Sequence, residues 1–322
     1  MYNSPCTMID IEKAIAALDW KREPYGLYEP IEYTLASGGK RLRPQLVLLA
    51  AEMFGGKEKE VLPAALAIEV FHNFTLLHDD VMDKAAVRRG RPTVHVRWND
   101  NTAILSGDQM VIEAYKLLSN VPADRLPQTL RLFNKMATEI CEGQQYDMEF
   151  ETRDQVSIEE YMHMIRLKTS VLLATALKIG AYIAGASETQ QQALYEYGIN
   201  IGLAFQIQDD ILDVYGNPET FGKAIGGDIC CNKKTYMLLT AMQRADEATR
   251  AELEHWLQIQ DKPDEKIRAV TDIYTRTGAR EVCETVMQLH THEALSQLDA
   301  LPQNDATEQL RKLAEKLAIR KV

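Results

Sequence analysis

Apolar residues recur at helical spacing along almost the whole chain, and runs of alternating β-branched residues are nearly absent. This pattern predicts a fold that is mostly or entirely α-helical and needs no strand. The predicted helices cover residues 9–19, 44–54, 61–82, 103–118, 126–150, 158–184, 190–214 and 235–244, with three or four more towards the C-terminus. We therefore expect an all-α bundle of long helices around a deep central cavity.

The chain of 322 residues is long enough for one large core or two smaller ones. It has no linker rich in proline, glycine or serine and no low-complexity tract, so we expect a single domain over residues 1–322. The nearest approach to a membrane span is Val171 to Ala186, which is short and interrupted by Lys178. We expect a buried core helix there, and we expect no membrane span.

Charge and cysteine content narrow the class of protein. A net charge of −11 disfavours nonspecific nucleic-acid binding, which needs a basic surface. The five cysteines include no C-x-x-C pair, and the N-terminus lacks the apolar segment of a secretory signal. These features are typical of a cytoplasmic protein with reduced thiols and no nucleic-acid partner.

The strongest chemical signal is a repeated acidic pentapeptide, Asp-Asp-x-x-Asp, at residues 79–83 and again at 209–213. Side chains three and four residues apart share a helical face, so each copy places its carboxylates together. One copy alone is as typical of a solvated helix face, but two copies that each follow apolar sequence favour a functional site. The six carboxylates are Asp79, Asp80, Asp83, Asp209, Asp210 and Asp213.

These carboxylates would repel one another and take up protons unless cations held them apart. Oxygen ligands without cysteine or histidine favour Mg²⁺, which usually keeps several waters and is completed by substrate phosphates. The sequence therefore predicts a Mg²⁺ site for a polyphosphorylated substrate.

Positive charges follow in the pattern that a diphosphate needs. Lys40, Arg41 and Arg43 come directly after a glycine pair and next to a helix start, where the backbone can approach an anion closely. Adjacent arginines at positions 88 and 89 suit bidentate phosphate contacts. A solvated loop is the alternative explanation for each of these charges taken alone. Further lysines are Lys168, Lys223, Lys233 and Lys234.

Together these motifs resemble those of the trans-isoprenyl diphosphate synthases, the polyprenyl synthetase family, in particular its short-chain geranylgeranyl and farnesyl diphosphate synthases. The order and spacing of the motifs match over residues 30–240. The matching stretches are Gly38 to Pro44, the two aspartate motifs, Arg88 to His95, Lys168-Thr169, Phe205-Gln206, Gly222-Lys223 and Asp228 to Thr235. The resemblance implies an isoprenoid synthase fold.

The resemblance also implies the reaction. This is the Mg²⁺-dependent head-to-tail (1′-4) condensation of isopentenyl diphosphate with an allylic diphosphate, which gives a short-chain all-trans prenyl diphosphate and releases diphosphate. Three Mg²⁺ ions per site are implied, for which Mn²⁺ could substitute, and so is a homodimer. Asp79, Asp83 and Asp209 would bind metal directly, whereas Asp80, Asp210 and Asp213 would act through water.

By the same resemblance, the other polar residues divide between the two substrates. The allylic diphosphate would be held by Arg88, Lys168, Thr169, Gln206, Lys223 and Lys233. Isopentenyl diphosphate would be held by Gly39, Lys40, Arg43, His72 and Arg89. The catalytic residues would be Asp79, Asp83, Asp209, Lys168 and Lys223. His78 is interpreted as structural.

The residues before the first motif bear on product length. Phe74 lies about 7.5 Å and Phe71 about 12 Å along the helix axis from Asp79, and the smaller Thr75 comes directly after Phe74. In the family, an aromatic residue five positions before this motif marks short products, and aromatic residues at both the fourth and fifth positions often mark the fifteen-carbon product. Phe74 has the smaller Thr75 beside it, which favours twenty carbons. Fifteen carbons is the alternative, and both phenylalanines could equally be ordinary core residues.

Three rival functions stay in view. A class I terpene cyclase shares the all-α architecture and a first aspartate motif, but its second metal motif would not be another Asp-Asp-x-x-Asp. A phosphohydrolase built on His78-Asp79 would need an upstream histidine pair with metal-ligand spacing. A noncatalytic subunit of a heteromeric prenyl synthase would have lost aspartates or lysines, and none is lost here.

Overall fold

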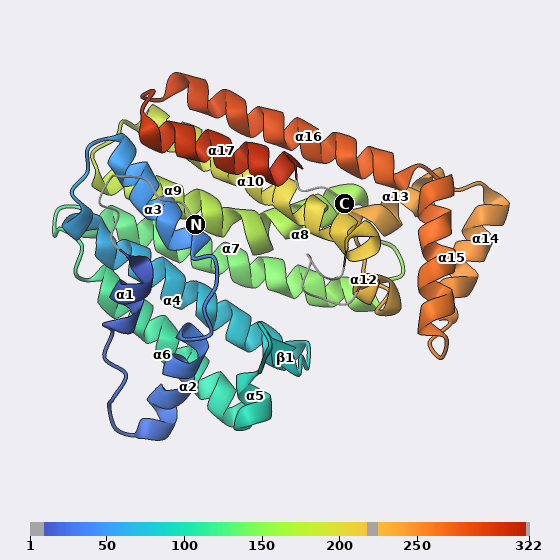
Figure 1. Ribbon diagram of the computed structural model, residues 1–322, viewed down its shortest axis with the longest axis horizontal. Helices are drawn as coiled ribbons and strands as arrows, with labels where there is room; N and C mark the ends of the chain where they lie inside the picture. Colours follow the sequence, from blue (N-terminus) through green and yellow to red (C-terminus); the bar gives the residue numbers. More distant parts are fainter. Residues whose placement is uncertain (1–9, 218–224, 320–322) are drawn as a thin grey trace. The chain divides into compact units, whose positions relative to one another are not determined.

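The computed structural model describes residues 10–217 and 225–319 (Figure 1). Over these residues almost every element is helical, which confirms the all-α prediction. The chain falls into two compact units. The N-terminal unit takes the described residues up to Phe133 together with 176–192, and the C-terminal unit takes 134–175 together with the described residues from Ala193 onwards. The single domain over residues 1–322 and the central cavity stay predictions.

The boundaries between the units fall within helices α7, α9 and α10. The bounds of these helices are Leu126–Thr152, Val171–Ile183 and Glu188–Tyr215. The other elements of the N-terminal unit are α1 (Ile11–Ala16), α2 (Tyr25–Leu35), α3 (Leu42–Met53), α4 (Glu58–Met82), β1 (Val87–Arg88), β2 (Arg91–Pro92), α5 (Val94–Arg97) and α6 (Asp100–Leu118).

Helix α4 is the core helix of the N-terminal unit. It packs against α3 and α6, and α2 and α5 contact both α4 and α6 (Figure 1). Every residue from Ala64 to Asn73 is buried, as expected for a helix that is enclosed on all sides. The buried part of α4 therefore holds the end of the helix, which carries the first aspartate motif, in a fixed position.

The C-terminal unit consists of helices packed on one another. Its remaining elements are α8 (Ile158–Ile165), the π-helical turn η1 (Arg166–Ser170), α12 (Gly227–Cys230), α13 (Tyr236–Arg244), α14 (Glu247–Gln258), α15 (Pro263–Arg276), α16 (Ala279–Gln297), the 3₁₀ turn η2 (Leu298–Ala300) and α17 (Asp305–Ile319). Helix α16 packs beside α13 and α17 (Figure 1).

Glycines let α10 approach its neighbours closely in this unit. A Cβ added at Gly198 would lie 2.4 Å from Ala174 Cα, and one added at Gly202 would lie 2.5 Å from Ser170 Cα. Next to Gly198, α10 is also held by the buried Tyr197, whose hydroxyl donates to Leu310 O at 2.7 Å. The helix with the second aspartate motif is therefore also fixed by tight packing.

The structure adds three details to the predicted secondary structure. A strand pair exists: β1 and β2 form an antiparallel hairpin in which Arg88 pairs with Arg91. Its two turn residues, Arg89 and Gly90, both have positive φ, at 52° and 74°, as a type I′ turn requires. Residues 158–184 are not one helix, because the π-helical turn η1 separates α8 from α9. Helix α2 was not predicted from the sequence.

The expected nearest approach to a membrane span is wrong. Within the described residues one helix, α4, is long and apolar enough to cross a membrane by length and composition, and 61% of its apolar window is buried. Residues 171–186 do not meet this test. A buried core helix passes it as readily as a membrane span, so the finding is weak evidence for a span.

Candidate active site

The first aspartate motif lies at the end of α4, in the N-terminal unit. Asp79 and Asp80 occupy its last turn and Asp83 is its C-cap residue. Asp79 is half-buried and Asp83 is exposed, whereas Asp80 is only 5% exposed. The first and last aspartates of the motif are therefore accessible, and the second one points into the protein.

Asp80 is bonded to the hairpin that follows α4. The Arg88 Nε–H donates to both carboxylate oxygens of Asp80, at 2.8 and 2.9 Å. Burial raises the pKa of Asp80, and the Arg88 charge and hydrogen bonds oppose that rise. The pair fixes the direction in which Arg88 leaves the hairpin.

The hairpin also connects to the glycine loop before α3. Arg89 donates to Ser37 Oγ at 3.2 Å and to the Gly38 carbonyl. A Cβ at Gly39, whose φ is +142°, would lie 3.1 Å from Arg89 Cζ. Glycine at position 39 is thus favoured by the backbone conformation, and its lack of a side chain lets the guanidinium lie close to it.

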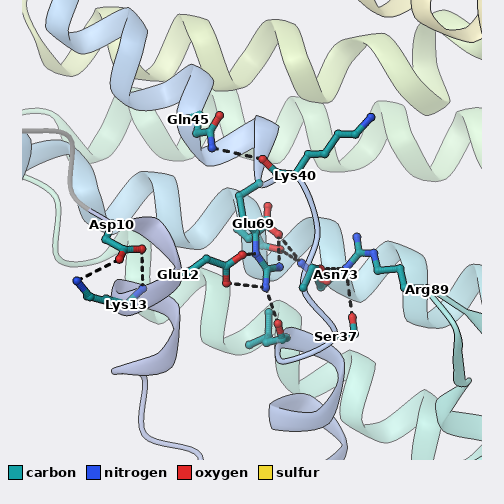
Figure 2. A network of polar contacts seen from close by, with 12 residues as sticks. Asp10, Glu12, Lys13, Ser37, Lys40, Gln45, Glu69, Asn73 and Arg89 are labelled. Atoms are coloured by element: carbon teal, nitrogen blue, oxygen red, sulfur yellow. Dashed lines mark hydrogen bonds and ion pairs between the residues drawn. The ribbon is translucent and has the colours of Figure 1, made fainter. Parts of the chain in front are cut away.

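The residues predicted to hold isopentenyl diphosphate are brought together in this unit. The positive charges of Arg43 and Arg89 reach His72 and, together with burial as the largest cause, hold the pKa of His72 well below its usual value. His72 is therefore neutral near pH 7. Lys40 is exposed, and its side chain points away from the buried contacts below it (Figure 2).

Arg43 has the features of an anion ligand. Its Nε is buried and has no hydrogen-bond partner within the described residues. Burial, as the largest cause, and the charge of Arg89 lower the pKa of Arg43 to about 10, against the opposing effect of the Glu69 charge. The guanidinium nevertheless stays protonated at neutral pH. A buried donor without an acceptor is costly, and a bound diphosphate would supply the acceptor.

Arg41, between Lys40 and Arg43, behaves differently. It is 5% exposed and donates to Glu12, Glu69 and the Leu35 carbonyl (Figure 2). Of the three cations after the glycine pair, the middle one is thus bonded inside the protein. Sequence spacing alone did not separate it from its neighbours.

The aromatic residues before the first motif form part of the core. Phe71 is 2% exposed, and its ring centroid lies 5.1 Å from that of Phe133 and 5.3 Å from that of Phe74. Phe74 is half-buried. The Thr75 hydroxyl donates to the His72 carbonyl at 2.8 Å. Phe74 is therefore the more accessible of the two phenylalanines.

His78 contacts α6. Its Nε2 lies 3.0 Å from the Ile104 carbonyl oxygen, and a Cβ at Gly107 would lie 2.2 Å from the same Nε2. These contacts agree with the structural role read from the sequence.

The second aspartate motif lies on α10, in the C-terminal unit. Asp209 is half-buried, whereas Asp210 and Asp213 are 3% and 8% exposed. Asp210 accepts from the Tyr161 hydroxyl at 2.5 Å and from the Tyr236 N–H at 3.2 Å. Asp213 accepts from the Asp228 N–H at 3.1 Å. As in the first motif, one aspartate is accessible while its neighbour is bonded to the protein.

The environment of Asp210 favours its neutral form. Burial, as the largest cause, raises the pKa of Asp210 to about 7, and the charge of Asp228 adds to the rise. The Tyr161 hydrogen bond and the charge of Lys233 act in the opposite direction. Tyr161, which the sequence did not single out, is thus the main partner of the second motif's buried aspartate.

Lys168 and Thr169 lie in the π-helical turn η1. The Lys168 ammonium donates to Asp147 Oδ2 at 2.5 Å. The Thr169 hydroxyl donates to Gln206 Oε1 at 3.2 Å, and the Gln206 amide donates to Asp210 Oδ1 at 3.4 Å. The π turn is therefore linked to the second aspartate motif by a chain of hydrogen bonds. Such turns occur frequently at functional sites.

Two further predicted lysines follow α10. Lys233 is exposed, and its backbone N–H donates to the Asp228 carbonyl at 2.9 Å. Its charge lowers the pKa of Asp210, so it lies near the second motif. Lys223 lies outside the described residues.

The donor set fits Mg²⁺ that binds together with a diphosphate. Within the residues described, no three His, Cys, Asp or Glu side chains converge closely enough to hold a metal ion by themselves. Mg²⁺ usually binds one or two carboxylates and is completed by water and substrate phosphates. The accessible oxygens of Asp79, Asp83 and Asp209 are hard ligands of this kind.

Comparison with known proteins identifies the family of the chain. A sequence model of the Polyprenyl synthetase family matches residues 24–274. The chain is 45% identical to a geranylgeranyl diphosphate synthase of Methanosarcina mazei over 236 residues, 73% of each chain. It is 41% identical to a short chain isoprenyl diphosphate synthase of Methanothermobacter thermautotrophicus over 294 residues, 91% of this chain and 90% of the other.

Solved structures give the same result. A crystal structure of a geranylgeranyl pyrophosphate synthase, 45% identical, matches with a TM-score of 0.91 over 97% of this chain and 96% of the other. A geranylgeranyl pyrophosphate synthase from Corynebacterium glutamicum, complexed with isoprenyl diphosphate and magnesium, is 30% identical and matches with a TM-score of 0.84 over 96% and 94%. The chain therefore belongs to the polyprenyl synthetase family and is a prenyltransferase that makes short-chain prenyl diphosphates.

Proposed function

We propose that this protein catalyses the Mg²⁺-dependent 1′-4 condensation of isopentenyl diphosphate with an allylic diphosphate, with a twenty-carbon product favoured. The observation on which this rests is the pairing of two aspartate motifs, each with accessible carboxylates, with separate groups of cations in each unit. In this proposal both motifs serve one active site in a single domain over residues 1–322.

The metal ions would be held by Asp79, Asp83 and Asp209, with Asp80, Asp210 and Asp213 acting through water. Burial and bonding of Asp80, Asp210 and Asp213 to the protein support that division. The magnesium named in the complex from Corynebacterium glutamicum supports the choice of ion. Three ions and substitution by Mn²⁺ are part of the proposal. When bound, Mg²⁺ would supply Lewis-acid stabilisation of the charge that develops on the leaving diphosphate.

Isopentenyl diphosphate would bind to the cationic group of the N-terminal unit, formed by Lys40, Arg43, His72 and Arg89 beside Gly39. Arg43 and Arg89 offer planar donors for phosphate oxygens. Neutral His72 adds a ring N–H without adding charge. The buried Nε of Arg43, which has no partner within the described residues, supports this use.

The allylic diphosphate would be held by Arg88, Lys168, Thr169, Gln206, Lys223 and Lys233. Arg88 is oriented by Asp80, and Lys168 by Asp147. These carboxylates would hold the cations in place before substrate arrives, so that little reorganisation is needed when it binds.

The reaction breaks one bond and forms another. The carbon–oxygen bond at C1 of the allylic substrate breaks, and diphosphate leaves with the electron pair. Arg88, Lys168 and Lys233 would stabilise the developing negative charge more than they stabilise the bound substrate. The double bond of isopentenyl diphosphate then attacks the allylic cation through C4, and a proton from C2 is lost to the departing diphosphate. Holding the two substrates in line would contribute much of the remaining acceleration.

Phe74 would limit product length, with Thr75 beside it leaving room for twenty carbons. The partial exposure of Phe74, against the buried Phe71, supports its role as the end of the tail pocket. A fifteen-carbon product is the alternative.

We also propose a cytoplasmic homodimer. In the N-terminal unit, α6 exposes the large apolar residues Ile104, Leu105 and Ile112, at 45%, 58% and 52%. Exposed apolar residues repeated along one helix are typical of a surface that another chain covers. Ile112→Glu should convert the dimer to monomer, as measured by sedimentation; an unchanged mass would remove this face from the proposal.

The central experiment removes one accessible carboxylate from each motif. Asp79→Ala and Asp209→Ala should each abolish Mg²⁺-dependent product formation from isopentenyl diphosphate and an allylic primer, while circular dichroism stays that of the native protein. Asp261→Ala, an exposed aspartate outside both motifs, is the control and should keep full activity. Full activity in either motif variant would refute the metal assignment.

A further inference from the structure

Arg41 pairs with two carboxylates of the N-terminal unit, Glu12 and Glu69, which are labelled in Figure 2. Its Nη1 donates to Glu69 Oε1 at 2.8 Å, its Nε to Glu12 Oε1 at 2.9 Å, and its Nη2 to the Leu35 carbonyl at 2.5 Å. The side chains of Arg41 and Glu69 are each only 3% exposed. Three separate helices, α1, α2 and α4, thus supply acceptors to one guanidinium.

Glu69 accepts further hydrogen bonds within this network. Its Oε1 also accepts from Asn73 Nδ2 at 2.9 Å, and the same amide donates to the Glu69 carbonyl at 2.8 Å (Figure 2). Glu69 lies on α4, one turn before His72. Its negative charge also opposes the lowering of the pKa of both Arg43 and Arg89, so it lies near these two cations as well.

The backbone at Arg41 shows why an anchor is needed there. Arg41 precedes α3 with φ at +46°, a left-handed conformation that is unfavourable for a side chain other than glycine. Gly38 and Gly39 before it also have positive φ. Side chains bond to this loop at three places: Arg89 donates to Ser37 and Gly38, the Gln45 amide donates to the Lys40 carbonyl, and Arg41 donates to Glu69 and Glu12.

Lys40 and Arg43 lie on either side of Arg41 in the sequence. We propose that the Arg41–Glu69 pair is a positioning device for the isopentenyl diphosphate site, which holds Lys40 and Arg43 in their binding positions without contacting the substrate. This inference rests on the proposed function, because it takes Lys40 and Arg43 as ligands of isopentenyl diphosphate.

The pair has two electrostatic consequences of opposite sign. Glu69 offsets the repulsion among Arg41, Arg43 and Arg89, which lets these cations remain close together before an anion binds. The same negative charge weakens the attraction of the site for a diphosphate. If positioning dominates, neutralising Glu69 weakens binding of isopentenyl diphosphate; if the local charge dominates, it strengthens binding. The direction of the change in KM therefore decides between the two.

Glu69→Gln is the test variant, because it removes the charge while it keeps the side-chain shape. We expect KM for isopentenyl diphosphate to rise about tenfold, equivalent to about 1.4 kcal/mol. KM for the allylic diphosphate should stay within about twofold of wild type, because its proposed ligands in the C-terminal unit have no part in the network. Binding of isopentenyl diphosphate alone, measured by calorimetry, should weaken by the same factor.

Glu113→Gln is the matched control. Glu113 is 8% exposed, accepts from Arg22 at 3.0 Å, from the Gln109 amide at 2.8 Å and from the Lys116 ammonium at 2.9 Å, and belongs to the same unit. It thus has the same kind of partners as Glu69 but no contact with the glycine loop. Glu113→Gln should change thermal stability about as much as Glu69→Gln does, and it should leave both KM values unchanged.

Glu12→Gln gives a second, milder variant in case Glu69→Gln does not fold. Glu12 is 55% exposed and bonds the same guanidinium, so its neutralisation should raise KM for isopentenyl diphosphate by about threefold and leave the fold intact. Unchanged or lowered KM for isopentenyl diphosphate in the folded variants, or an equal rise in both KM values, overturns the positioning role.

Failure of this inference is distinguishable from failure of the proposed function. Arg43→Gln, which removes a proposed ligand directly, should raise KM for isopentenyl diphosphate whether or not Arg41 is a positioning residue. If Arg43→Gln has no effect on that KM, the proposed site is wrong. If it has the expected effect and the Glu69 and Glu12 variants do not, only the positioning inference is wrong.

Discussion

The position of the π turn η1 can be tested by adding one methyl group. Gly143 on α7 lies against the backbone of this turn, and a Cβ added there would lie 2.4 Å from Lys168 N. Ordinary contact begins at 3.4 Å, so Gly143→Ala must separate the two segments by about 3.4 − 2.4 = 1.0 Å. The contacted atoms belong to the backbone, so side-chain rotation cannot relieve the overlap.

A shift of this size should be visible in the kinetics of the allylic substrate. Misplacing a substrate-positioning group by about 1 Å can cost about 100-fold in rate, which corresponds to about 2.7 kcal/mol. We expect kcat/KM for the allylic diphosphate to fall by about this factor. KM for isopentenyl diphosphate should change by less than about twofold, because its proposed ligands belong to the N-terminal unit. Steady-state rates with each substrate varied in turn measure both effects.

Gly198→Ala provides the matched control. Gly198 is on α10, and its added Cβ would lie 2.4 Å from Ala174 Cα. The overlap is equal and in the same unit, but the contacted residue lies on α9, after the π turn. Both substitutions should cost about 1–3 kcal/mol of stability from overpacking, less about 1 kcal/mol that alanine regains in a helix. Wild-type allylic kinetics in Gly143→Ala, or equal kinetic losses in the two variants, would refute the reasoning.

Three further predictions follow from the site. Phe74→Ala should lengthen the product, as sized by chromatography, and an unchanged product profile would exclude Phe74 as the end of the pocket. Tyr161→Phe should lower the free energy of unfolding in urea by about 1.5–3 kcal/mol, because buried Asp210 loses its 2.5 Å partner; a loss near zero would contradict this. Because the pKa of His72 lies well below its usual value, the unfolded chain binds a proton that the folded one does not, so stability should be lost as pH falls below about 6.5. Replacement of His72 by Asn should reduce that loss in thermal melts, and an equal loss in the variant would be evidence against it.

The helical content and the position of the acidic motifs could be predicted from the sequence, because apolar periodicity and residue spacing are local properties. The hairpin could not be predicted by periodicity, because strands of two residues are too short to show alternation. Its turn gave only a weak signal, because Gly90 suits a type I′ turn but Arg89 is not one of the residues that favour its first position. The π turn has no sequence signal that we can identify, since it depends on how α7 and α10 pack against it.

The roles of individual charges depended on distant partners. Arg41 and Arg43 stand two positions apart after the same glycine pair, yet only Arg41 meets a buried carboxylate, Glu69, from another helix. Likewise Asp80 and Asp210 could be recognised as members of the motifs, but Arg88 and Tyr161, which bond them, come from other segments. Tertiary contacts of this kind determine which charged residues of a motif are bonded inside the protein and which remain accessible.

Both acidic motifs lie near the carboxyl ends of their helices, α4 and α10. The aligned peptide dipoles give that end of a helix a partial negative charge, so carboxylates there are disfavoured before any cation arrives. Each motif therefore carries an unfavourable electrostatic energy while no cation is bound. Divalent ions and diphosphate would relieve it on binding, so the metal-loaded, substrate-bound protein should resist heat and proteases better than the same protein kept in a chelator.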